Sequence, residues 1–385
     1  MTRNRWVLLA VVTIVAVVVA SGLALALTGG GRSGQARTTP PSSDPGVVRG
    51  DGDARTATEL GGEFLNAWVD DGRVIRRDQG NDTVSEGQAY GLLIALGVRD
   101  EESFDEIWDW TSDNLVRPDG LLAWQWDDGA IVDDEPASDA DLDVARALVL
   151  AGEEFDRPEL TEQGNELGRK ILDRMTVETA LGRILLPGMW AAAVEPYAYN
   201  PSYASPGAFA VLGTSSGDAR WGELQEGSAA VTATLLATSD LPPDWAQVHA
   251  DGSVDAMPGP AGTGTDVRYS YDAARLPLRY AESCRPADVA LAAELASTLS
   301  RKDVLPAELD LGGSALAEAV HPLAYGARAA ALAATGDDAS ARDDLAQAVS
   351  VLDDSPTYYG AAWAALAPLM LGSDRLGACP LLTKD

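Results

Sequence analysis

The amino-acid sequence predicts an all-α domain, built as a closed double ring of about twelve helices. From residue 54 onward, apolar residues recur at helical spacing almost throughout. Clusters of Gly, Pro and Asp divide this pattern into about twelve segments that fall into consecutive pairs. No internal repeat aligns the segments, which disfavours a regular solenoid. Twelve helices in one body therefore suggest a closed double ring of helices.

The chain begins with a candidate membrane anchor. Arg3 and Arg5 precede an uncharged, predominantly apolar run over residues 6–27, which is long enough to cross a bilayer as a helix. We expect an uncleaved signal anchor with its positive flank in the cytoplasm. Residues 24–26, Ala-Leu-Ala, offer the alternative of a cleavage site. In either case the rest of the chain is exported, tethered to the cell membrane or secreted.

The sequence divides the chain into three expected regions. Residues 1–28 are the expected anchor. Residues 29–53 are rich in Gly, Ser, Pro and Thr and lack apolar periodicity, so they are expected to form a flexible linker. Residues 54–385 are the expected folded domain, and we expect this domain to be a monomer.

The expected helices of this domain are separated by three long connectors, over residues 117–136, 180–201 and 241–266. Long loops inside a compact domain usually carry function. The expected helices span residues 55–69, 85–98, 101–115, 139–154, 159–175, 202–214, 218–239, 269–281, 286–300, 315–335, 339–353 and 358–371.

Three tryptophans lie in these connectors: Trp124, Trp126 and Trp190. Their rings suit stacking on the apolar C–H faces of sugars, since aromatic side chains combine a large apolar surface with a defined plane. The alternative is that they close the ends of the helical core. We treat them as candidate stacking platforms.

The stretch over residues 136–149 opens with acids and closes as an apolar helix. Ser138 or Asp139 is expected to cap this helix, and acids suit the positive end of its dipole. Leu142 and Leu148 lie on the face that is expected to be buried. Such a helix holds Asp139 rigidly at the edge of a cleft, although the acids would equally complement the dipole with no further role.

Glu86 lies in the first turn of another expected helix, where Gly87 and Gly91 clear a strip for close packing. A carboxyl group beside apolar and aromatic neighbours has a raised pKa, which a general acid requires. The structural alternative is an ordinary acid at a helix N-terminus.

Asp272 and Arg275 form the third candidate. They lie three residues apart, on one helical face, so Arg275 is expected to favour the ionised form of Asp272. An ionised Asp suits a general base. A surface ion pair is the alternative, but the flanking Tyr271 and the following Pro277 are unusual for an exposed helix.

Composition excludes several other classes of function. Lys and Arg number 28 against 59 Asp and Glu, a formal charge of −31, which disfavours binding to nucleic acid. The two histidines and two cysteines are too few for a zinc site, and neither His249 nor His321 lies in a recognisable nucleophile motif. We expect no cofactor. Cys284 and Cys379 are either one disulfide or two buried thiols.

Together these segments resemble glycoside hydrolase family 8. Residues 137–141, ASDAD, and the apolar helix after them resemble the family signature, with Val144 in place of its usual Ile or Met. Residues 85–91, SEGQAYG, resemble the proton-donor segment, and residues 271–275, YDAAR, the catalytic-base segment. Residues 200–203 and 241–245 are most similar to the cellulases associated with bacterial cellulose synthesis. The resemblance covers residues 54–372 and keeps the order of the motifs.

The resemblance implies an (α/α)6 barrel that hydrolyses internal β-1,4 bonds of a glycan with inversion. It implies that Glu86 is the general acid, Asp272 the base that activates water, and Asp139 a ligand of the sugar at the cleavage point. Tyr203 and Arg275 would orient the water or the base. The glycan stays open among cellulose, mixed-linkage glucan, xylan and chitosan.

Two other classes of function remain as alternatives. One is a non-catalytic glycan-binding protein that assists polysaccharide synthesis or export, but both catalytic carboxyl positions are occupied. The other is a lyase that acts on acidic sugars, which requires a positive subsite that a charge of −31 makes less natural.

Overall fold

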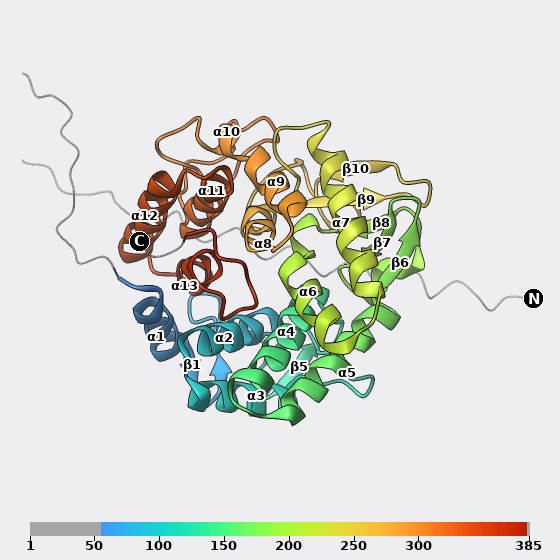
Figure 1. Ribbon diagram of the computed structural model, residues 1–385, viewed down its shortest axis with the longest axis vertical. Coiled ribbons are helices and arrows are strands. Elements are labelled where there is room, and N and C mark those ends of the chain that lie inside the picture. The colour runs from blue at the N-terminus through green and yellow to red at the C-terminus, as the bar shows by residue number, and fades with distance from the viewer. Residues whose placement is uncertain (1–54, 383–385) are drawn as a thin grey trace, which may run out of the picture. The chain divides into compact units, whose positions relative to one another are not determined.

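The computed structural model describes residues 55–382. Six of the helices in this range form an inner ring by their mutual contacts, and Figure 1 shows their arrangement. Each helix of this ring contacts the next in chain order, and the last contacts the first. The inner helices are α2 (Ser85–Val98), α4 (Ser138–Glu154), α6 (Pro206–Ser216), α8 (Leu276–Ala281), α11 (Pro322–Thr335) and α13 (Tyr358–Gly372).

A second set of helices surrounds this ring, and each of its members contacts at least one inner helix. The outer helices are α1 (Ala57–Trp68), α3 (Glu101–Asn114), α5 (Pro158–Arg174), α7 (Arg220–Leu236), α9 (Pro286–Glu294) and α12 (Asp338–Asp354). This arrangement is the expected (α/α)6 barrel.

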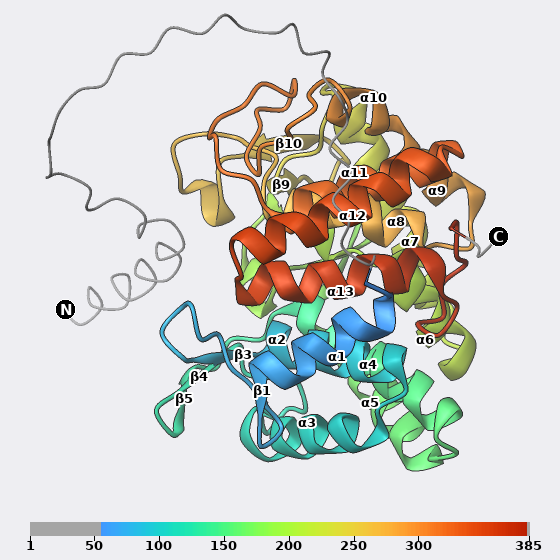
Figure 2. The same ribbon diagram turned by 90° about the vertical axis from the view of Figure 1, so that its left-hand side faces the viewer.

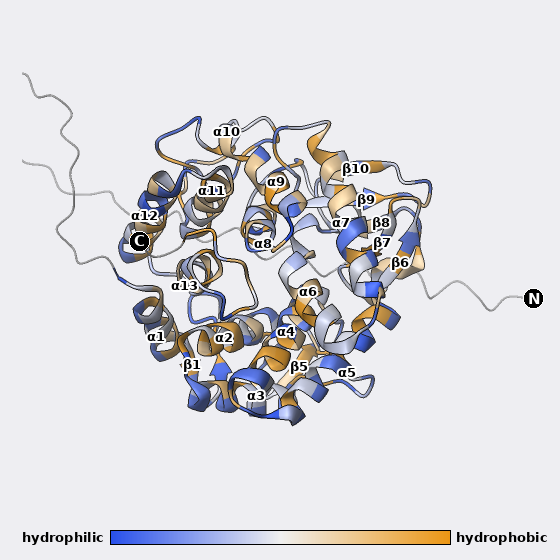
Figure 3. Ribbon diagram, in the orientation of Figure 1, coloured by the Kyte–Doolittle hydropathy of each residue, from blue (hydrophilic) through white to orange (hydrophobic). Residues whose placement is uncertain are grey.

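The sequence explains which helices lie inside. Residues 87–97 of α2 are all buried, whereas α5 buries a stripe that includes Leu160, Leu167 and Ile171 and leaves charged residues on its other face. A helix that is apolar all round needs neighbours on every side, and an amphipathic helix needs them on one. Hydrophilic residues accordingly gather on the outward faces of α3, α5 and α12 (Figure 3).

All twelve expected helical segments contain a helix, with differences at several boundaries. The segment 286–300 is divided into α9 and α10 (Ala296–Leu299). The segments 202–214 and 315–335 start later than expected, at Pro206 and Pro322. Proline lacks the N–H that later helical positions donate and has a helical φ, so it is favoured in the first turn.

Ten short strands were not expected from the sequence, and they form four small antiparallel sheets within the described residues. Local pairing satisfies backbone groups in connectors that would otherwise lack partners. The β4–β5 hairpin projects from the helical body (Figure 2). The strands are β1 (Val69–Asp70), β2 (Arg73–Val74), β3 (Thr83–Val84), β4 (Gln125–Asp127), β5 (Ala130–Asp133), β6 (Thr176–Thr179), β7 (Gly182–Leu185), β8 (Tyr197–Tyr199), β9 (Trp245–Val248) and β10 (Val254–Met257).

Buried ion pairs join α4 to α8 and the residue that follows it. Arg279 Nη1 donates to Asp143 Oδ1 at 2.7 Å. Arg146 binds both oxygens of Glu282 at 2.8 Å, and neither side chain of this pair is exposed. The two ion pairs are spaced by about one helical turn, so they fix the register of α4 against α8. The same register sets how the residues at the start of α4 lie relative to those just before α8.

The cysteines form the disulfide that was one of the two alternatives: Cys284 and Cys379 are bonded, with their Cα atoms 5.0 Å apart. The expected anchor and linker, residues 1–53, lie outside the described residues. Within residues 55–382, no helix is both long and apolar enough to cross a bilayer.

Candidate active site

Arg275 lies at the centre of three carboxylates that come from distant parts of the sequence. Its Nη1 donates to Glu86 Oε2 at 2.8 Å and to Asp139 Oδ2 at 2.9 Å. Its Nη2 donates to Asp272 Oδ1 at 2.6 Å. The three motifs that the sequence singled out therefore meet around one guanidinium.

Glycines allow the helix that carries Glu86 to pack closely. A Cβ atom at Gly87 would lie 2.9 Å from the hydroxyl oxygen of Tyr358, and one at Gly91 would lie 2.9 Å from Val74 Cγ2. Both distances are too short for a real contact. The strip that the sequence predicted thus lets α2 approach its neighbours and sets the position of Glu86 in its first turn.

Asp139 does not cap its helix, so the capping prediction is wrong. Helix α4 begins at Ser138, its N-cap residue is Ala137, and no side chain caps it. Asp139 Oδ1 instead accepts from the N–H of Ala140 at 2.9 Å. This bond aims the other oxygen, Oδ2, at Arg275.

Asp272 and Arg275 are bonded as their spacing predicted, but Arg275 is buried. It belongs to a short 3-10 helix, η4 (Ala273–Arg275), that leads into α8. Its Nε donates to Ser202 Oγ at 3.2 Å, and its guanidinium carbon lies 5.2 Å from the centre of the Tyr203 ring. Tyr203 therefore joins the cluster, as expected.

The four side chains of the cluster differ in their exposure to solvent. Two are buried and form the floor of the cluster, and two are accessible acids. The Arg275 and Asp139 side chains are 1% and 6% exposed. The Glu86 and Asp272 side chains retain 24% and 33%. A molecule that reaches the cluster from solvent therefore meets Glu86 and Asp272 first.

The electrostatics of the cluster favour a proton on Glu86 near neutral pH. Burial raises the pKa of Glu86, the charge of Arg275 lowers it, and the charges of Asp139 and Asp272 raise it, so that the pKa lies at about 7. Burial also raises the pKa of Asp139, again against the effect of Arg275. Glu86 is thus the accessible carboxyl that can donate a proton at neutral pH.

The three predicted tryptophans lie in different surroundings. The carbonyl oxygen of Trp124 accepts from the N–H of Ser85 at 2.9 Å, which places Trp124 beside the start of α2. Trp126 is half-buried, with the guanidinium carbon of Arg73 4.3 Å from its ring centre. Trp190 is 40% exposed, so it retains the most accessible ring.

Three further polar residues of the site lie in segments that the family resemblance covers, but none of them was predicted as a site residue. Tyr90, one turn after Glu86, receives a bond from Arg275 Nη1 at 3.2 Å, and helical spacing places the two residues on one face. Ser202 contacts Arg275 as described above. Asp244 binds the segment that carries Asp272, and no local pattern links residues so far apart.

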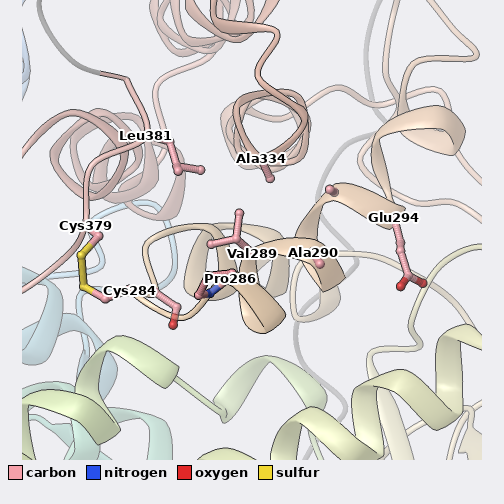
Figure 4. Close-up of a pocket in the computed structure, with 10 residues that line it drawn as sticks. Cys284, Pro286, Val289, Ala290, Glu294, Ala334, Cys379 and Leu381 are labelled. Atoms are coloured by element: carbon pink, nitrogen blue, oxygen red, sulfur yellow. A yellow bond between two sulfur atoms is a disulfide. The ribbon is translucent and has the colours of Figure 1, made fainter.

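A separate apolar concavity lies beside the disulfide (Figure 4). Its lining includes Cys284, Val289, Ala334 and Leu381, and none of the clustered carboxylates. The described residues also hold no group of three or more His, Cys, Asp and Glu arranged to bind a metal ion. The carboxylate cluster is therefore the candidate site.

Sequence comparisons show which family the chain belongs to. The chain matches the family model of the glycosyl hydrolases of family 8 over residues 63–372. It is 30% identical over 300 residues to a probable endoglucanase of Novacetimonas hansenii, a match that covers 76% of this chain and 83% of that protein.

Solved structures show the same architecture. The endo-beta-1,4-glucanase CMCax of Acetobacter xylinum matches with a TM-score of 0.70 at 26% identity, over 82% of this chain and 97% of that one. A beta-1,3-1,4-glucanase of Paenibacillus sp. X4 matches with a TM-score of 0.73 at 18% identity, over 82% and 90% of the two chains, which shows the fold alone. The chain belongs to the glycosyl hydrolases of family 8.

Proposed function

We propose that this protein is an endo-β-1,4-glucanase that cleaves with inversion at the anomeric carbon. The observation that carries the proposal is the meeting of Glu86, Asp139 and Asp272 around Arg275. Glycoside hydrolysis by this route needs one protonated and one ionised carboxyl group. The similarity to a probable endoglucanase and to an endo-beta-1,4-glucanase supports a β-1,4-linked glucan as the substrate.

In the proposed reaction Glu86 is the general acid. It gives its proton to the glycosidic oxygen as the bond from that oxygen to the anomeric carbon breaks. Asp272 takes a proton from a water molecule, whose oxygen attacks the anomeric carbon from the opposite face. Glu86 ends ionised and Asp272 protonated, and exchange with solvent restores both groups.

Inversion requires space for a water molecule beside the base. Inverting enzymes hold their two carboxyl groups ~6.5–9.5 Å apart, so that a water molecule fits between the second carboxyl and the sugar. Glu86 and Asp272 bind different nitrogens of the Arg275 guanidinium, Nη1 and Nη2. Asp139, on the floor, is proposed to bind the sugar at the cleavage point.

We also propose that the domain works outside the cytoplasm, tethered to the cell membrane. The support is the apolar run over residues 6–27 with Arg3 and Arg5 before it. Protease treatment of intact spheroplasts tests this proposal: the domain is expected to be digested from outside and to stay with the membrane fraction until then. Complete protection from protease contradicts export.

The substitution Glu86→Gln tests the acid, because it removes the proton and nearly preserves shape. We expect release of reducing sugar from soluble β-1,4-glucan to fall by about 10²–10⁴-fold. Glu166→Gln is the matched control, since Glu166 is an exposed carboxylate on α5 bound to Arg169. Equal activity of the Glu86 variant and wild type would rule out the proposed acid.

The configuration of the first product tests the base. NMR of the anomer formed in the earliest phase of hydrolysis is expected to show the α form, because water attacks opposite the β bond. A β product contradicts Asp272 as the base that activates water. Binding of glucan without any hydrolysis would instead favour a non-catalytic glycan-binding protein.

A further inference from the structure

Asp244 holds the chain on both sides of Asp272. Its Oδ1 accepts from the N–H of Ser270 at 2.8 Å and from the N–H of Ala273 at 2.9 Å. Its Oδ2 accepts from the Ser270 hydroxyl. One half-buried carboxyl group therefore bridges the residues that lie two before and one after Asp272.

Asp244 is itself anchored to a separate part of the fold. Trp245, the next residue, begins β9. The N–H of Asp244 also donates to the carbonyl of Arg268, four residues before Asp272, at 2.8 Å. β9 pairs with both β8 and β10, so the sheet fixes where Asp244 lies. The Trp245 ring meets the Tyr203 ring edge-on, with centres 6.1 Å apart.

Other bonds also hold the segment that carries Asp272: Tyr269 exchanges two backbone hydrogen bonds with Leu309, and the Arg275 side chain binds the site carboxylates. Asp272 precedes the three-residue helix η4, in which Arg275 donates its N–H to the carbonyl of Asp272 at 3.0 Å. From α13, the Tyr359 hydroxyl donates to the carbonyl of Tyr271 at 2.9 Å. Within residues 55–382, Asp244 is the only residue whose side chain accepts hydrogen bonds from the N–H groups of residues 270–275.

We propose that Asp244 is a positioning residue: it fixes the direction of the Asp272 carboxylate by bridging the N–H groups of Ser270 and Ala273. This rests on Asp272 being the base of the proposed function. A base that must reach one water molecule depends on its placement, and a displacement of about 1 Å costs up to ~10²-fold in rate.

Charge is not required for this bridge. Burial and the nearby charge of Asp272 raise the pKa of Asp244 to about 7, against the bonds from Ser270 and Ala273. A proton on Oδ2 would face the Ser270 hydroxyl, which can accept it, while Oδ1 keeps both N–H bonds. Asparagine reproduces that protonated form, with its carbonyl oxygen in the place of Oδ1.

Three substitutions in the full chain separate geometry from charge. Asp244→Ala removes the bridge, and kcat is expected to fall about 10–100-fold with KM changed by less than about threefold. Asp244→Asn keeps the bridge without the charge, and kcat is expected to stay within about threefold of wild type. Asp244→Glu keeps the charge but displaces the oxygens, so its kcat is expected to fall as in the Ala variant. Thermal unfolding checks that each variant is folded.

Two results overturn the inference: an Ala or Glu variant with wild-type kcat, or an Asn variant as slow as the Glu variant. The Asn and Glu variants decide the question even where the Ala variant does not fold. Asp272→Asn is measured in parallel. If it is inactive while Asp244→Ala is fully active, only the role of Asp244 is rejected; if it is fully active, the proposed base and this inference fail together.

Discussion

Replacing Arg275 with methionine tests whether one buried cation holds the site together. Methionine keeps an unbranched apolar chain but removes the group that binds Glu86, Asp139 and Asp272. Breaking a buried ion pair by removing one partner costs about 3–5 kcal/mol of unfolding free energy. Glu86 and Asp272 are partly exposed and regain water, so we expect about 3 kcal/mol, the lower end of this range.

The loss is expected to depend on pH. Arg275 lowers the pKa of Glu86 and Asp139 against burial, so its removal raises both values further. A carboxyl with a raised folded-state pKa binds more protons in the folded than in the unfolded protein, and its stabilising contribution is lost as pH rises. The variant should therefore lose about 3 kcal/mol at pH 8 and clearly less at pH 4.

Urea unfolding of wild type and variant at the two pH values measures this difference, provided that the m-values agree. Arg275→Lys is the control. It keeps the charge, but a compact ammonium group lacks the planar fork that reaches three carboxylates, so an intermediate loss is expected. A loss below about 1 kcal/mol at pH 8, or equal losses at pH 4 and pH 8, would refute the reasoning.

Three further predictions concern the acid, the core and the disulfide. Because the pKa of Glu86 is raised to about 7, kcat/KM should fall about tenfold per pH unit above that value, and a pH–rate profile that is flat to pH 9 would contradict it. Arg146→Met leaves the buried Glu282 unpaired, so chemical unfolding should show a loss of about 3–5 kcal/mol; a loss below 1 kcal/mol would mean that solvent reaches Glu282. Replacing Cys284 and Cys379 by Ser frees a closed loop of 95 residues and should cost about 2–4 kcal/mol in reversible unfolding while kcat stays unchanged, whereas a fall in kcat would link the disulfide to the site.

Much of the fold was predictable because helical periodicity is a local property. Apolar residues three and four apart identify each helix without knowledge of its neighbours, and all twelve expected segments contain one. The short strands were not predictable in this way. Two- to four-residue strands such as β3 carry too few residues to show alternation, and their partners are set by the helices that bring the connectors together.

The candidate site, like the fold, was predictable only where local sequence carries the signal. Glu86, Asp139 and Asp272 were singled out from the helices and motifs around them, and the structure places all three on Arg275. Local sequence patterns did not predict the role of Asp244, because this residue binds Ser270 and Ala273, which lie 26 and 29 positions further along the chain.

The sequence by itself determined the helices, the motifs that carry the acids, and the family resemblance, since each depends on residues close together in the chain. Only the tertiary structure decided that Arg275 is buried beside Asp139 and Glu86, which lie 136 and 189 positions before it in the chain. It also decided that Cys284 bonds Cys379 and that Asp139 faces the site instead of capping its helix. The physical reason is that burial and charge pairing depend on which helices become neighbours when the ring closes, and no short stretch of sequence contains that information.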